Sequence, residues 1–143
     1  MTNDLSSIED ICANMRSVFE RVLTISDIKG VSGTCLYAAI LLQQSLEKFC
    51  ACEAVVRGGD GGADGGARDV RGGWHGHYWV EGVCGRDLPF LADITADQFG
   101  WPPVVVLHLA VARDRYVPGD DSVCGRAVDA EIDRMLGAVR VDE

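Results

Sequence analysis

The feature that most constrains the fold is an apolar helical segment in the first half of the chain. From Cys35 to Phe49 the sequence reads Cys-Leu-Tyr-Ala-Ala-Ile-Leu-Leu-Gln-Gln-Ser-Leu-Glu-Lys-Phe, with apolar residues on almost every side of its first half. A helix that is apolar all round is covered by other elements. We therefore expect a helix that begins between Ser32 and Cys35, is buried at the centre of the molecule, and has a polar side only toward its end.

The segments around this helix predict one helix before it and strands after it. Residues 7–23 have apolar positions at helical spacing, and a loop with a stop at Gly30 should follow. Runs rich in β-branched and aromatic residues predict strands over 52–57, 76–81, 88–95 (broken at Pro89) and 104–111. We expect a turn at 82–85, a short turn or helical piece at 96–99, and a helix over 123–141. This order predicts an α+β fold in which N-terminal helices, with the Cys-bearing helix at the centre, pack on an antiparallel β-sheet.

Length and composition limit the classes of function. The 143 residues suit a single domain over 1–143, in which the glycine-rich segment 58–69 is expected to be a flexible loop. The net charge of −9 argues against a nucleic-acid partner, which requires a basic face. No apolar run is long enough for a membrane helix, and the polar first residues do not resemble a secretory signal, so a cytoplasmic location is expected.

The chain has six cysteines, which the sequence predicts to be mostly small buried hydrophobes rather than disulfides. No Cys-x-x-Cys pair exists, and Asp60, Asp64 and Asp69 do not follow the calcium-loop pattern. We therefore expect neither a metal nor a cofactor.

Cys35 is the candidate nucleophile, because it should occupy the first turn of the central helix. The small residues Ser32, Gly33 and Thr34 lead into that helix. Unpaired N–H groups and the helix dipole at such an end favour a thiolate and can hold an oxyanion. A buried structural cysteine is the alternative.

His77 is the candidate base. In Trp74-His-Gly-His-Tyr-Trp-Val-Glu81, strand alternation puts His77, Trp79 and Glu81 on one face. His75 shares this parity and is the rival; we prefer His77 because it lies inside the regular strand. A metal site formed by His75 and His77 would need a further ligand.

Asp93 is the candidate carboxylate that orients the imidazole, since it lies in an otherwise apolar strand where a charge needs a partner. A turn cap is the alternative role, and Asp97 is the fallback residue. Gln98 could orient His77 or donate to an oxyanion, and Trp79 could form a wall of the site.

These segments together resemble the transglutaminase-like branch of the papain-like cysteine enzymes. The likeness covers about residues 31–100 and rests on Gly33-Thr-Cys35, Gly76-His-Tyr-Trp-Val-Glu81 and Ala92-Asp-Ile-Thr-Ala-Asp-Gln-Phe99. Small bacterial and phage-associated proteins look similar in the last two segments. The resemblance implies a papain/transglutaminase-like core and a catalytic triad of Cys35 as nucleophile, His77 as base and Asp93 as orienter.

The sequence thus predicts a cysteine-dependent acyl-transfer enzyme that forms a thioester on Cys35. Its substrate would be a protein or peptide amide, and hydrolysis, as by a peptidase or a deamidase, is favoured over crosslinking because water needs no second binding site. The alternative is a non-catalytic protein-binding module that keeps the same fold.

Overall fold

The computed structural model describes residues 5–26, 34–85 and 88–141, and only the backbone of 137–141. Its helices are α1 (Ser6–Ile25), α2 (Cys35–Phe49), the short 3₁₀ helix η1 (Ala96–Phe99), α3 (Leu109–Ala112) and α4 (Asp121–Val141). Its strands are β1 (Glu53–Asp60), β2 (Gly66–Arg68), β3 (Trp74–Cys84), β4 (Leu88–Asp93), β5 (Val105–His108) and β6 (Tyr116–Val117). The predicted α+β class, with helices packed on an antiparallel sheet, is confirmed.

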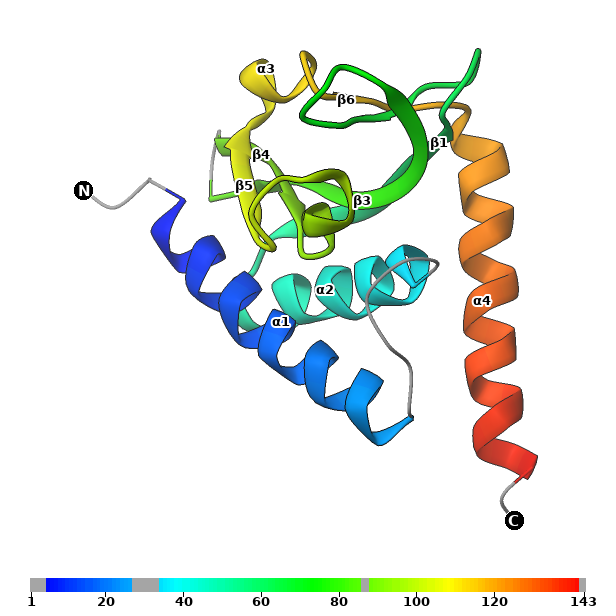
Figure 1. Ribbon diagram of the computed structural model, residues 1–143. Helices are drawn as coiled ribbons and strands as arrows, with labels where there is room; N and C mark the ends of the chain where they lie inside the picture. The colour runs from blue at the N-terminus through cyan, green and yellow to red at the C-terminus, as the bar shows by residue number, and fades with distance from the viewer. Residues whose placement is uncertain (1–4, 27–33, 86–87, 142–143) are drawn as a thin grey trace.

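The sheet is organised around β3, the longest strand. Every strand pairing in the described ranges is antiparallel. Gly82 of β3 pairs with Ala54 of β1 and with Phe90 of β4, so these two strands flank β3 on opposite edges. β5 pairs beyond β4, and β2 links β3 to β6. Figure 1 shows α1 and α2 together on one side of the sheet, with α4 standing beside β1.

The two faces of the sheet bury different clusters. On one face Val80 and Ala92 pack with α2 and with the stripe of α1 formed by Ile8, Cys12, Phe19 and Leu23. On the other face Trp79 and Leu91 pack with Tyr116. The period of two along a strand explains the division. The expected burial of the first half of α2 holds only in part, because Ala38, Ala39 and Ile40 are buried whereas its first three residues are half-buried.

The turn predicted at 82–85 is wrong, because β3 continues to Cys84. A glycine inside a strand often marks a close backbone approach. A side chain at Gly82 would collide with the carbonyl oxygen of Glu53, so the glycine here allows pairing rather than a turn. Pro89 likewise does not break β4, where it pairs with Val83.

The expectation of a loop throughout 58–69 is also wrong at both ends. Gly58–Asp60 complete β1, and Gly66–Arg68 form β2, so a turn occupies only 61–65. Added side chains at Gly58 and Gly59 would meet Tyr78 and the backbone of Gly66, which explains why glycines occupy these strand positions.

The strand expected over 104–111 ends at His108, and α3 follows. Its ladder with β4 stops at the Phe90–His108 pair. The next residue on β4 is Pro89, which has no N–H to donate. The predicted Gly30 stop and the small residues Ser32 and Gly33 lie outside the described residues.

Candidate active site

Cys35 is the first residue of α2 and is half-buried. The Ala38 N–H donates to the Thr34 carbonyl oxygen over 3.1 Å, which is the first bond of the helix. In helix geometry the N–H groups of Cys35, Leu36 and Tyr37 therefore have no acceptor within the helix. The thiol thus lies where the helix dipole favours negative charge, as the sequence predicted.

His77 and Asp93 form a buried pair on neighbouring strands. Only 1% of His77 and 2% of Asp93 is exposed, and His77 Nε2 lies 2.8 Å from Asp93 Oδ2. Val80 pairs with Ala92, so these two residues share one face of the sheet. The next residue, Asp93, therefore points to the opposite face, which carries Trp79 and His77. The strand register thus brings the predicted imidazole and carboxylate together.

The Asp93 carboxylate is fully engaged, which makes its burial affordable. Besides His77, the Tyr116 hydroxyl donates to Oδ2 over 2.7 Å, and the Thr95 N–H and hydroxyl donate to Oδ1 over 2.9 and 3.2 Å. Burial acts to raise the pKa of Asp93, but the charge of His77 and these hydrogen bonds outweigh it, so the pKa is lowered. Asp93 therefore stays ionised.

Cys35 is an interaction partner of the same imidazole. Burial acts to lower the pKa of His77, yet Asp93 and a hydrogen bond and attraction from Cys35 raise it from 6.5 to about 9. Nε2 is bound to Asp93, which leaves Nδ1 as the ring nitrogen that can serve the thiol. The Cys35 thiol therefore interacts with the His77 ring and the ring with the Asp93 carboxylate, in the order that the sequence predicted.

Gln98 and Trp79 lie beside the His77 ring. Gln98 Nε2 lies 3.4 Å from His77 Nδ1 and donates to the Thr95 carbonyl oxygen over 3.0 Å. The buried Trp79 ring lies 6.1 Å from the His77 ring and donates through Nε1 to Glu81. Gln98 thus lies beside the ring without a short bond to it, and Trp79 packs next to it.

The rival residues are bound elsewhere. His75 is exposed, pairs with Asp69 over 2.6 Å and stacks on Phe99. Asp97 accepts two bonds from Arg16, over 2.8 and 2.9 Å. In the part of the chain that the structure describes, no group of three His, Cys, Asp or Glu side chains is arranged to hold a metal ion.

Two neighbours of His77 were not predicted from the sequence. Tyr116 is held on β6 by pairing with Ala67 and reaches Asp93, and Phe99 on η1 touches the His77 ring edge-on at 4.8 Å. A two-residue strand has no periodicity, so nothing in the sequence marks Tyr116 as part of the site.

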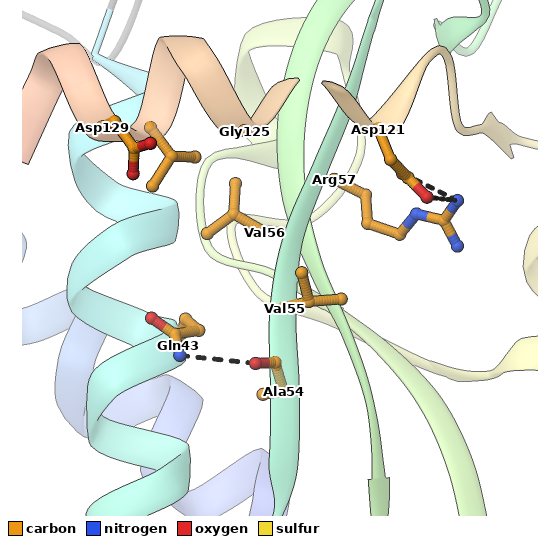
Figure 2. A pocket seen from close by; sticks show the side chains of 9 residues that line it. Gln43, Ala54, Val55, Val56, Arg57, Asp121, Gly125 and Asp129 are labelled. Carbon is orange, nitrogen blue, oxygen red and sulfur yellow. Dashed lines mark hydrogen bonds and ion pairs between the residues drawn. The ribbon is translucent and has the colours of Figure 1, made fainter. Parts of the chain in front are cut away.

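A cavity of about 410 Å³ opens between α2, β1 and α4 (Figure 2). Gln43 bonds the Ala54 carbonyl on one side of it, and Arg57 pairs with Asp121 on the other. Neither Cys35 nor His77 lines this cavity. The space beside Cys35 itself is narrow, and the residue is half-buried. The α2–β1–α4 cavity thus lies apart from the candidate residues.

No protein-family model, curated protein or solved structure matches this chain. None of the helices in the described ranges has the length and apolarity needed to cross a membrane.

Proposed function

We propose that this protein is a cysteine-dependent amide hydrolase with a papain/transglutaminase-like core, acting through a thioester on Cys35. The observation that carries the proposal is the placement of one buried imidazole between an ionised carboxylate and a thiol at a helix N-terminus. These are the nucleophile, base and orienter that acyl transfer needs, arranged in the right sequence of contacts.

The pair of Cys35 and His77 accounts for the first half of the reaction. His77, with a pKa of about 9, holds its proton at neutral pH, and a cationic ring beside a cysteine favours the nucleophilic thiolate. The thiolate adds to the amide carbonyl carbon, and the π electrons move to the oxygen, which lies near the first N–H groups of α2. As the C–N bond breaks, His77 gives its Nδ1 proton to the departing amine, which leaves a thioester.

Water completes the cycle. The neutral His77 takes a proton from a water molecule while the water oxygen attacks the thioester carbonyl carbon. Collapse of the resulting adduct breaks the C–S bond and releases a carboxylic acid and the Cys35 thiolate. Asp93 keeps Nε2–H donated to itself, so Nδ1 remains the nitrogen that exchanges the proton. A peptide bond or a side-chain amide satisfies this chemistry equally, which covers both peptidase and deamidase activity.

Selective alkylation tests the proposal. Wild type, His77→Ala and, as a matched control, His75→Ala would be treated with iodoacetamide at pH 7, and modification at each cysteine followed by mass spectrometry. We expect Cys35 to react at least ~100-fold faster than Cys50, which is also half-buried, and this advantage to vanish only in His77→Ala. Equal slow reaction of both cysteines would reject the chemistry and favour a binding module.

A further inference from the structure

A second cavity of about 410 Å³ gathers positive charge on an acidic protein. Its lining includes Arg68, Arg71 and Arg115, against the two carboxylates Asp69 and Asp114, whereas the whole chain carries a net charge of −9. The three arginines come from separate places, namely β2, the turn after it and the residue before β6. The fold therefore concentrates guanidinium groups at this point.

Within the described residues none of the three guanidinium groups is in an ion pair, and that of Arg115 is fixed by stacking. Arg115 Cζ lies 3.6 Å above the Trp101 ring, and Trp101 Nε1 donates to the Arg68 carbonyl over 2.8 Å. No ion pair within the described residues engages Arg71. Asp69, by contrast, already accepts from the backbone of Arg71 and Gly73 and pairs with His75. This leaves donors in the cavity for an outside anion.

The cavity lies next to the proposed active site. The Val70 N–H donates to the Phe99 carbonyl over 3.1 Å, and the Phe99 ring meets His75 on one contact and His77 on another. Arg115 also acts on the Tyr116 hydroxyl, where it opposes the rise in pKa that burial and Asp93 cause. Phe99 thus contacts both a residue of the cavity lining, Val70, and the His77 ring.

We propose that this cavity, which we call the arginine pocket, binds a carboxylate of the substrate, so that the enzyme favours peptide amides with an acidic residue near the bond that Cys35 attacks. The inference rests on the proposed function. A planar guanidinium matches a carboxylate with two parallel hydrogen bonds, and an arginine stacked on an aromatic ring loses little freedom on binding. On a chain that otherwise repels acids, such a pocket distinguishes acidic peptides from neutral ones.

Two matched peptides test the arginine pocket by calorimetry at low salt. They are acetyl-Gly-Gly-Glu-Gly-Glu-Gly-amide and its glutamine counterpart, titrated into Cys35→Ala protein so that no turnover occurs. The Glu peptide should bind about tenfold more tightly than the Gln peptide. Arg71→Gln and Arg115→Gln should each remove most of that preference, whereas Arg126→Gln, an equal loss of charge on the exposed side of α4, should leave it intact.

Equal binding of the two peptides, or a preference that survives Arg71→Gln and Arg115→Gln, would overturn the inference. Arg71 is exposed, so its replacement does not threaten the fold and keeps the test valid if Arg115→Gln is unstable. The two proposals fail separately. Fast alkylation of Cys35 without a Glu preference rejects only the pocket. A Glu preference with slow alkylation of Cys35 rejects the chemistry, and the pocket is then a carboxylate site without a role in substrate choice.

Discussion

Two buried carboxylates lie on the same face of the sheet and are stabilised by different partners. Asp93 is bound by His77, Tyr116 and Thr95, whereas Glu81 is bound by Arg113, Arg57 and Trp79. Burial acts to raise the pKa of both, and in both the partners lower it. Among these partners only His77 can give up and take back a proton in a reaction, because arginine stays charged. A buried charge alone therefore does not indicate catalysis; the chemistry of its partner does.

The largest expected effect is on the free energy of unfolding when either carboxylate is replaced. Asp93→Ala leaves His77 buried without its acceptor and should lower the free energy of unfolding by about 3–5 kcal/mol, the typical cost of breaking a buried pair. Glu81→Ala should cost less, about 1–3 kcal/mol, since the side chains of Arg57 and Arg113 are 26% and 38% exposed and can turn to water. Urea unfolding at pH 7 measures both. An equal or larger loss in Glu81→Ala would contradict the comparison.

Stability should also depend on pH through His77. Its pKa is raised from 6.5 to about 9 in the folded protein, so its proton contributes stability that is complete below pH 6.5 and lost as pH rises through 9. The loss amounts to about 3 kcal/mol. Urea unfolding between pH 6 and 10 should show this decline in wild type and in Glu81→Gln, and a much flatter profile in His77→Gln. The same slope in all three proteins would show that His77 does not carry it.

Tyr116→Phe should have a smaller effect, because it removes one of four donors to Asp93. We expect a loss of about 1–2 kcal/mol in the free energy of unfolding. Tyr78→Phe is the matched control, since Tyr78 is half-buried on the opposite face of β3 and should lose less than about 0.5 kcal/mol. If the two variants unfold alike, the bond from Tyr116 does not support the carboxylate.

Gln98→Ala should give the smallest change. Its amide is half-buried and its contact with Nδ1 is long at 3.4 Å, so stability should fall by less than about 1 kcal/mol. The alkylation rate of Cys35 should change by less than about threefold, because Asp93 alone fixes the ring. A loss as large as that in His77→Ala would make Gln98, rather than Asp93, the residue that orients the imidazole.

The parts of the site that follow regular periods could be predicted from the sequence. Helical spacing located Cys35 at the start of α2, and strand alternation put His77 on the face of Trp79 and Glu81. His75 shares that face, and the reason given for preferring His77 is wrong, because β3 begins at Trp74 and contains both histidines. The two rings differ in their partners, because His75 binds Asp69, in the turn after β2, whereas His77 binds Asp93. Such a contact has no local sequence pattern.

The unpredicted parts of the fold depend on contacts between distant residues. Gly82 and Gly58 look like turn residues, yet both lie in strands, where the close approach of the neighbouring strand requires glycine. Tyr116 reaches Asp93 only because β6 pairs with β2, far away in the sequence. A local pattern cannot distinguish a glycine in a turn from one in a crowded strand.

The most direct test of the account is an NMR titration of the histidine rings, which is simple to assign because the chain has only three histidines. In wild type His77 should titrate near pH 9, and Cys35→Ser should lower that pKa, because the thiol helps to hold the ring proton. Cys50→Ser, the control, should leave it unchanged. A His77 ring that titrates near its ordinary 6.5, or one that Cys35→Ser does not affect, would contradict the proposed pairing of thiol and imidazole.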